Sequence, residues 1–168
     1  FFAPLFLLLI MLVAGWYYAQ SADQRETVSA SGQKILIADG DSFAFGSRKM
    51  RLDGIDAPEY RQLCTDEAGR DWECGKAARA SLEKLMLEPD LQCEVEVHDK
   101  YARALATCRT AHTADVAAAQ VSEGLAVSHE FNGMRDYGDQ EDVARTARKG
   151  IWRGPFQRPE EWRAEHQR

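Results

Sequence analysis

Three short apolar runs separated by tight turns constrain the fold of this chain more than any other feature. The runs are Ile35 to Ala38, Ser42 to Phe45 and Lys49 to Ile55. The dipeptide Asp39-Gly40 between the first two favours a tight turn. Pro58 ends the third run, because proline cannot donate to a strand ladder. Each run is therefore a predicted strand of a small sheet.

Helical and hairpin patterns follow these strands. Apolar residues recur at helical spacing from Cys74 to Leu87. Apolar and polar residues alternate from Leu91 to Val97, which is the period of a half-buried strand, and Arg103 to Arg109 is expected to pair back with it. The capping residues predict two further helices, from Thr113 as N-cap to Ser122 and from Gly138 or Asp139 to Gly150.

This order of elements predicts an α+β, mainly β fold. We expect a five-stranded OB-fold barrel with about three packed helices, whose open face often holds oligonucleotides in proteins of this type. A chain of 168 residues is long enough to bury a core of this kind. The charged segment Arg158 to Arg163 is predicted to be a solvated docking tail.

The apolar segment Phe1 to Ala19 is interpreted as a signal peptide or a membrane anchor. It carries no charged residue, and about 18 apolar residues are just enough to cross a bilayer. A signal peptide would be cut after Ala19-Gln20-Ser21, a small-x-small site. An anchor would be retained in the membrane with Trp16 to Tyr18 at the interface. Both interpretations place the domain outside the cytoplasm, with residues 20–33 as a linker and residues 34–168 as the folded domain.

The four cysteines agree with export, because an even number of cysteines in an exported chain indicates disulfides. A hairpin that pairs Val97 with Ala104 sets Cys93 directly opposite Cys108, within reach of a bridge. Free thiols are one alternative. Zinc fits less well, since the chain has no Cys-x-x-Cys pair and no cluster of histidines. The remaining bridge would be Cys64–Cys74, closing a short polar loop.

Three polar segments place carboxylates and guanidiniums at the ends of predicted strands. They are Asp39 to Ser42, Arg51 to Glu59 and Asp99 to Arg103. Carboxylates supply the oxygen ligands that hard divalent cations need, and arginine meets two phosphate oxygens at once without losing its proton. A carboxylate beside a metal can also take a proton from an attacking water. Each segment alone could be an ordinary turn or strand end, but together they contain the parts for metal-assisted phosphodiester hydrolysis.

The order and spacing of these segments resemble the staphylococcal nuclease (thermonuclease) family. Ile37 to Glu59 is similar to the family's run of strand, Asp-Gly-Asp-Thr, strand and Arg-Leu-x-Gly-Ile-Asp-Ala-Pro-Glu. Asp99 to Arg103 is similar to its Asp-x-Tyr-Gly-Arg turn. Glu141 to Trp152 is similar to its Glu-x-x-Ala-Arg-x-x-x-x-Gly-(Leu/Ile)-Trp helix end. The resemblance covers roughly Lys34 to Trp162.

The resemblance implies a Ca²⁺-dependent phosphodiesterase, and the apolar leader and the cysteines add the expectation that it is exported. We expect a monomer. Its substrate would be single-stranded or locally open DNA, with RNA as a second substrate, and its products would carry 3′-phosphates. The alternative is a non-catalytic OB-fold module that binds nucleic acid or protein. Carried over by position, the implied roles are Ca²⁺ binding by Asp41, Asp56 and the backbone carbonyl of Ala57, water activation by Glu59, phosphate contacts by Arg51 and Arg103, and nucleotide contacts by Lys100 and Tyr101.

The net charge of −6 argues against nucleic acid as a partner, but the local distribution of charge answers this objection. Basic residues near the predicted site would form a rim around an acidic metal cup. A polyanion responds to charges within about a Debye length, roughly 8 to 10 Å, more than to the net charge. The rim residues are Lys49, Arg51, Arg61, Lys100 and Arg103.

Two local backbone features affect the direction in which the side chains of Arg51 and Arg103 point. Ala102 replaces the glycine of the family pattern, and if the backbone there has a positive φ, alanine costs about 1 kcal/mol or more and alters the aim of Arg103. Strand alternation would put Arg51 and Asp56 on opposite faces of the sheet. We therefore expect a bulge or a strand end near Gly54.

Overall fold

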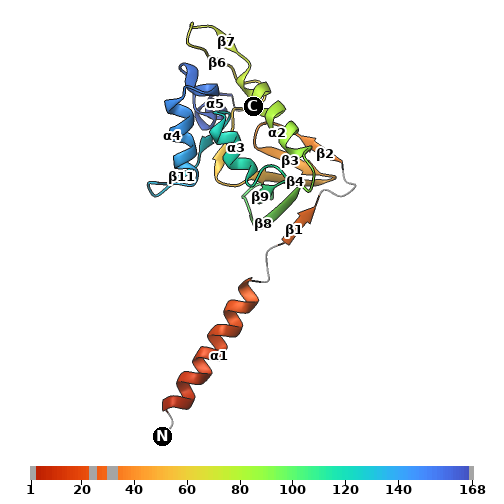
Figure 1. The fold of residues 1–168 in the computed structure, drawn as a ribbon, viewed down its shortest axis with the longest axis vertical. Helices are drawn as coiled ribbons and strands as arrows, with labels where there is room; N and C mark the ends of the chain where they lie inside the picture. The colour runs from red at the N-terminus through yellow and green to blue at the C-terminus, as the bar shows by residue number, and fades with distance from the viewer. Residues whose placement is uncertain (1–2, 23–25, 30–33, 167–168) are drawn as a thin grey trace.

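A six-stranded mixed sheet, curled into a half-barrel, forms the centre of the fold in the computed structural model (Figure 1). The structure describes residues 3–22, 26–29 and 34–166. The strand order is β1-β8-β9-β4-β3-β2, and only β4 and β9 are parallel among these described neighbours. The strands are β1 (Glu26–Ser29), β2 (Ile35–Ile37), β3 (Ser42–Phe45), β4 (Arg48–Leu52), β8 (Gln92–His98) and β9 (Ala104–Arg109).

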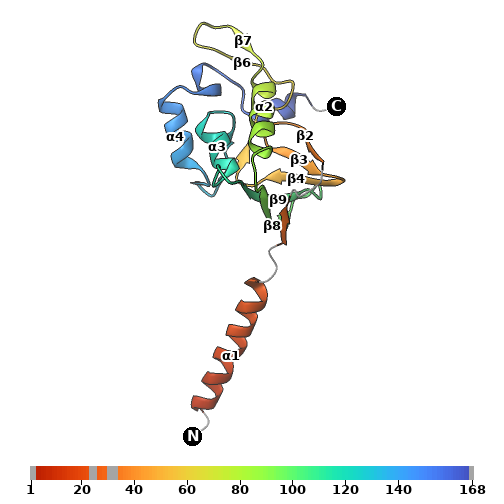
Figure 2. The same ribbon diagram turned by 45° about the vertical axis from the view of Figure 1, so that its right-hand side comes forward.

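Five α-helices and three two-stranded sheets complete the described part of the chain. Helices α2 and α3 pack on the large sheet, and α4 packs on α3. Helix α1 stands apart from them in both views (Figures 1 and 2). The helices are α1 (Ala3–Ala22), α2 (Cys74–Met86), α3 (Val116–Ser122), α4 (Gly138–Thr146) and α5 (Pro159–Glu165), and the small sheets pair β5 (Ile55–Asp56) with β10 (Val127–Ser128), β6 (Cys64–Thr65) with β7 (Asp71–Trp72), and β11 (Glu130–Phe131) with β12 (Met134–Arg135).

The predicted α+β class is confirmed, and α2, α3 and α4 are the three helices expected beside the sheet. Closure into an OB-fold barrel is not seen among the described strands, because β1 and β2 are the two edges of one open sheet. The third predicted strand is also shorter than expected. It ends at Leu52, and after a turn at Asp53 and Gly54 the chain forms β5, which pairs with β10 in a separate two-stranded sheet.

The N-terminal part of the described chain is helical and then contributes an edge strand. Residues 3–22 form α1. No helix among the described residues is long and apolar enough to cross a membrane. Within the segment expected to be a linker, residues 20–33, strand β1 pairs with β8. Residues 1–2 of the expected leader and residues 23–25 and 30–33 of the expected linker lie outside the described residues.

The main core lies between β3, β4 and α2. Alternate side chains of the two strands point inward, as strand geometry requires, and α2 adds apolar residues spaced four apart, which share one face of a helix. This packing holds the start of β3 against α2, so it also positions the polar turn before β3. The large buried side chains are Phe43, Phe45, Met50 and Leu52 from the strands and Leu82 and Met86 from α2.

Both predicted disulfides are confirmed. Cys93 and Cys108 face each other in the β8–β9 ladder, with Cα atoms 4.1 Å apart. Cys64 is bridged to Cys74 at the start of α2, with Cα atoms 5.6 Å apart. A bridge of this kind contributes about 2–4 kcal/mol to stability, and disulfides persist in oxidising compartments. The two bridges therefore favour an extracytoplasmic location.

The β8–β9 hairpin contains one irregularity. Its register shifts between Val95 and Val97, so the predicted pairing of Val97 with Ala104 is wrong, and Val97 pairs with Leu105. One extra residue in a strand produces such a shift and bends the strand locally. The Cys93–Cys108 pair lies on the far side of the shift from the turn, where the predicted register holds.

The N-cap of α3 is Asp115 and not the predicted Thr113. The Asp115 carboxylate accepts a hydrogen bond from the backbone N–H of Ala118 at 3.0 Å, which is the usual way a side chain satisfies the first turn of a helix. The Thr113 hydroxyl instead donates to the Glu88 carboxylate at 2.8 Å. A tertiary partner thus replaces the local capping role that the sequence favoured.

Helix α4 ends earlier than the predicted Gly150. Its last residue is Thr146, and Arg148 has a φ of 50°. A left-handed residue cannot continue a right-handed helix. The chain therefore leaves the helix before Gly150, and a 3₁₀ turn, Gly150–Arg153, follows.

Candidate functional site

Asp41 is the buried anchor of the candidate site. It lies just before β3 and is only 2% exposed. Its Oδ2 atom accepts a hydrogen bond from the Ala57 N–H at 3.0 Å, and the Ser42 hydroxyl donates to its Oδ1 atom at 2.6 Å. Asp41 therefore ties the turn before β3 to the segment that follows β5.

Arg51, on β4, joins two of the predicted calcium ligands. Its Nη2 atom lies 2.7 Å from Asp41 Oδ2 and 2.6 Å from Asp56 Oδ1. Because both oxygens approach the same nitrogen, they are close enough to face a single cation. The expected strand end near Gly54 is confirmed, and it places Asp56 on the same side of the chain as Arg51.

Burial and neighbouring charges set the protonation of this cluster. Burial, together with the charge of Asp41, raises the pKa of Asp39 to about 7. Burial lowers the pKa of Arg51, but the charges of Asp41 and Asp56 outweigh it and the net shift is upward. Arg51 therefore keeps its positive charge between the two carboxylates.

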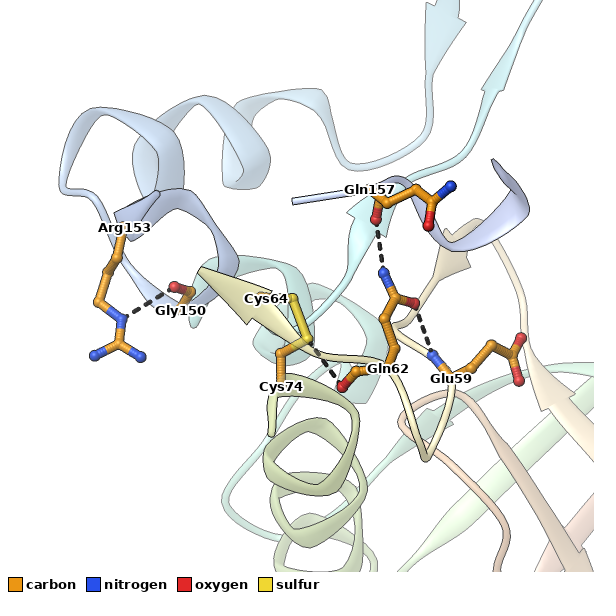
Figure 3. Close-up of a disulfide and its surroundings, with 7 residues drawn as sticks. All are labelled: Glu59, Gln62, Cys64, Cys74, Gly150, Arg153 and Gln157. Atoms are coloured by element: carbon orange, nitrogen blue, oxygen red, sulfur yellow. Dashed lines mark hydrogen bonds between the residues drawn. A yellow bond between two sulfur atoms is a disulfide. The ribbon is translucent and has the colours of Figure 1, made fainter. Parts of the chain in front are cut away.

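Glu59 is held by its backbone to a buried glutamine (Figure 3). Gln62 is fully buried, and its Oε1 atom accepts a hydrogen bond from the Glu59 N–H at 3.2 Å. Its Nε2 atom donates to the carbonyl of Gln157 at 2.6 Å. The Cys64–Cys74 bridge lies beside this glutamine in the same view. The loop that carries Glu59 is thus fastened to the start of α2 and to the C-terminal segment.

Two glycines allow the backbone of the site to approach α2. A Cβ atom on Gly75, in the first turn of α2, would lie 1.8 Å from the carbonyl oxygen of Glu59. A Cβ atom on Gly40 would lie 2.6 Å from the Cβ of Ala78 and 2.7 Å from that of Ala57. No side chain fits at either distance. Glycine at these positions therefore brings both site loops into contact with the same helix.

Arg163, on α5, is the site residue that the sequence analysis missed. Its Nη1 atom lies 2.9 Å from Asp56 Oδ1 and 2.9 Å from Glu59 Oε1, and its Nη2 atom lies 2.9 Å from Asp56 Oδ2. The prediction that this tail is a solvated segment is therefore wrong for Arg163. Proline at the first helical position and acidic residues in the first turn indicate a helix here. No local pattern indicates where that helix docks.

The three other predicted site residues form a cluster with Asp99 at the β8–β9 turn. The Asp99 carboxylate accepts hydrogen bonds from the backbone N–H groups of Tyr101 at 2.8 Å and Arg103 at 3.0 Å, and from Arg103 Nε at 2.8 Å. Lys100 and Arg103 each lie over the Tyr101 ring, at 5.1 Å and 5.5 Å from its centre. The parallel pairing of β4 with β9 sets Arg51 opposite Leu105. Arg103 directly precedes β9, and its described contacts are with Asp99 and the Tyr101 ring, not with Arg51, Asp41 or Asp56.

Replacing Ala102 by glycine is expected to stabilise the protein by about 1 kcal/mol. Ala102 has a φ of 59°. This left-handed conformation costs a residue with a Cβ atom roughly 1–2 kcal/mol. Glycine avoids this strain, but it also raises the conformational entropy of the unfolded chain, which offsets part of the stabilisation. Urea unfolding measures the difference. The control is Ala147→Gly, at a φ of −80°, where the same change should destabilise by roughly 0.5–1 kcal/mol. Equal losses at both positions would contradict a strained turn.

The predicted calcium ligands are oxygen donors, which is the kind of ligand that a hard divalent cation prefers. Asp41, Asp56 and the carbonyl of Ala57 supply the donor atoms that calcium prefers, and the first two already share one cationic nitrogen. Among the described residues, no group of three or more His, Cys, Asp or Glu side chains is arranged to hold a metal ion. The carboxylate oxygens are instead paired with Arg51 and Arg163. The residues therefore match calcium in the type of their donor atoms and in the closeness of Asp41 to Asp56.

A pocket of about 350 Å³ opens beside Asp56. One wall comes from the segment that contains β10 and β11, and the other comes from the start of α5. Asp56 therefore stands between the buried cluster and a space bounded by the C-terminal helix. The polar residues of the lining are Asp56, Ser128, His129, Glu130, Asn132, Arg158 and Glu160.

The fold and the site define a small α+β domain in which carboxylates and arginines cluster beside a curled sheet. The chain belongs to the family of staphylococcal nuclease homologues, whose model matches residues 49–154. This match confirms the resemblance read from the sequence motifs. It contains Arg51, Asp56, Glu59 and Arg103 but ends before α5.

The name of one curated relative refers to the biosynthesis of succinoglycan and not to a nuclease. The chain is 33% identical over 123 residues to the succinoglycan biosynthesis protein ExoI of Rhizobium meliloti (strain 1021). The match covers 73% of this chain and 64% of that protein, so the chain spans slightly less than two thirds of its relative.

Proposed function

We propose that this chain is an exported, Ca²⁺-dependent nuclease that hydrolyses phosphodiester bonds of DNA, with RNA as a second substrate, and leaves 3′-phosphates. The observation that carries the proposal is the meeting of Asp41 and Asp56 at one nitrogen of Arg51, at 2.7 Å and 2.6 Å. It occurs in a chain of the staphylococcal nuclease homologue family. The two disulfides support the exported location.

Asp41, Asp56 and the backbone carbonyl of Ala57 are the residues that would hold calcium. When bound, the ion would supply Lewis-acid polarisation of a phosphoryl oxygen. The chain itself provides the two carboxylates with a rigid setting, since Asp41 accepts from Ala57 N–H and α2 closes on both loops through Gly40 and Gly75. Electrostatic catalysis requires charged groups that are already in position and do not move during the reaction.

Glu59 would take a proton from the attacking water. Its backbone is fixed by Gln62, and its carboxylate is one quarter exposed, so water can reach it. Arg51 and Arg103 would stabilise the charge that develops on the phosphate. Lys100 and the exposed Tyr101 would meet the neighbouring phosphate and base, because an exposed aromatic ring is a stacking surface for bases.

Hydrolysis of labelled single-stranded DNA in the presence of Ca²⁺, and its loss on chelation, is the expected result of the direct test. The product ends should carry 3′-phosphates, which treatment with a 3′-phosphatase detects. Asp56→Asn, purified in the same way, is the control for contaminating nucleases and should be inactive. Ca²⁺-independent cleavage, or cleavage of equal rate by Asp56→Asn, would refute the proposed site.

A non-catalytic binding module is the second candidate function. Two observations favour it: the relative from Rhizobium meliloti is named for succinoglycan biosynthesis, and both oxygens of Asp56 are paired with arginines. Binding of single-stranded DNA without cleavage in the same assay would support this alternative over the nuclease.

A further inference from the structure

The C-terminal helix α5 lies outside the family match, yet it contributes a charge to the site. The match ends at residue 154, and Arg163 lies on α5 with its guanidinium against Asp56 and Glu59. The two carboxylates belong to the segment from β5 to Gln62, near the middle of the site. A segment beyond the matched residues therefore reaches the candidate metal ligands.

Few polar contacts of the described residues fasten this segment to the rest of the fold. The Gln157 carbonyl accepts from Gln62, and the Pro155 carbonyl accepts from the N–H of Thr65. Both lie before α5. Within the helix, Arg163 makes the ion pairs with the site. Arg163 is therefore the charged link between α5 and the carboxylates.

The hydrogen bonds of Arg163 use the oxygens that a divalent cation would need. Both carboxylate oxygens of Asp56 and one of Glu59 accept from it at 2.9 Å. Calcium binds carboxylate oxygens at about 2.3–2.6 Å, and a guanidinium stays charged at any physiological pH. Arg51 and Arg163 already share Oδ1 of Asp56, at 2.6 Å and 2.9 Å, so a divalent cation would be a third positive group at one partly buried carboxylate and would repel both arginines. Arg163 alone also contacts Oδ2. A cation that binds both oxygens of Asp56 therefore has to break the hydrogen bonds of Arg163.

We propose that Arg163 is a built-in counter-ion of the cation site, which a divalent cation must displace, so that cation binding at Asp56 loosens α5. This inference rests on the proposed calcium site. Thermodynamic linkage makes the two effects equal. The docking of α5 lowers the affinity for the cation by the same factor by which the bound cation weakens the docking of α5. The pocket beside Asp56 has its other wall at the start of α5, so the loosened helix would also widen access to the site.

Removing the charge of Arg163 is expected to tighten calcium binding. In Arg163→Gln, calorimetric titration with Ca²⁺ alone should give a dissociation constant lower by about tenfold, within the usual range of coupling between two sites. Hydrogen exchange of the α5 amides should rise on adding Ca²⁺ to the wild-type protein. In the variant, exchange should be fast from the start and insensitive to Ca²⁺.

Two further variants separate this effect from a general loss of charge. Arg148→Gln removes the same charge at an exposed position after α4 and should leave the calcium affinity unchanged. Arg163→Lys keeps the charge but not the paired hydrogen bonds, and its affinity should lie between those of wild type and Arg163→Gln.

The outcomes distinguish this inference from the proposed function. Equal or weaker calcium binding by Arg163→Gln, or α5 exchange that Ca²⁺ leaves unchanged in the wild type, overturns the inference and leaves the nuclease proposal standing. If Arg163→Gln binds Ca²⁺ more tightly as predicted, but the protein cleaves no nucleic acid, the inference is supported and the nuclease proposal is refuted. Absence of Ca²⁺ binding in all variants overturns both.

Discussion

Replacing Arg51 by methionine is expected to reduce both the stability and the activity of the protein. The guanidinium is the shared partner of Asp41 and Asp56, and the side chain of Asp41 is only 3% exposed. Removing one partner of a buried ion pair leaves an unpaired charge and costs about 3–5 kcal/mol. Loss of a preorganised charge at a reacting phosphate lowers turnover by about a hundred- to thousandfold.

Chemical denaturation and a nuclease assay measure the two effects of Arg51→Met separately. Arg109→Met is the matched control, because Arg109 is an exposed arginine on β9 that contacts only the amide of Gln92 among the contacts described for it. Its stability should change by about 0.5 kcal/mol or less. A fully stable Arg51→Met variant would contradict the bridge that Arg51 makes between Asp41 and Asp56.

Replacing Glu59 by glutamine is expected to lower Ca²⁺-dependent hydrolysis by about a hundredfold to ten-thousandfold, because an amide cannot accept the proton of an attacking water. The fold should be unaffected. Glutamine still offers an oxygen to Arg163, and the hydrogen bond from the backbone of residue 59 to Gln62 does not involve the side chain. Turnover at saturating DNA and Ca²⁺ is the measurement, with the melting temperature as the check on folding.

The control for Glu59→Gln is the same change at Glu73. Glu73 is exposed and pairs with Lys76 at the start of α2, so Glu73→Gln should leave turnover at the wild-type level. Full activity of Glu59→Gln would exclude Glu59 as the base. Arg51→Met and Glu59→Gln thus separate a residue needed for folding and chemistry from one needed for chemistry alone.

The sequence by itself determined the features that depend on neighbours along the chain. The helix α2 follows from apolar residues four apart, and the Cys93–Cys108 bridge follows from the register of a hairpin. The meeting of Asp41 with Arg51 has the same origin, because β3 and β4 pair directly after a short turn. Short-range sterics and apolar periodicity set such contacts before the rest of the domain is in place.

Only the tertiary structure decided which groups neutralise the site and where the sheet ends. Arg163 meets Asp56 across 107 residues of chain, and Gln62 meets Gln157 across 95. Strand β5 pairs with β10 in a separate small sheet, and β1 and β2 are the edges of the large one. Contacts of this range carry no signature in residue spacing, because the docking of α5 and the choice of strand partners depend on packing and buried polar groups summed over the whole domain.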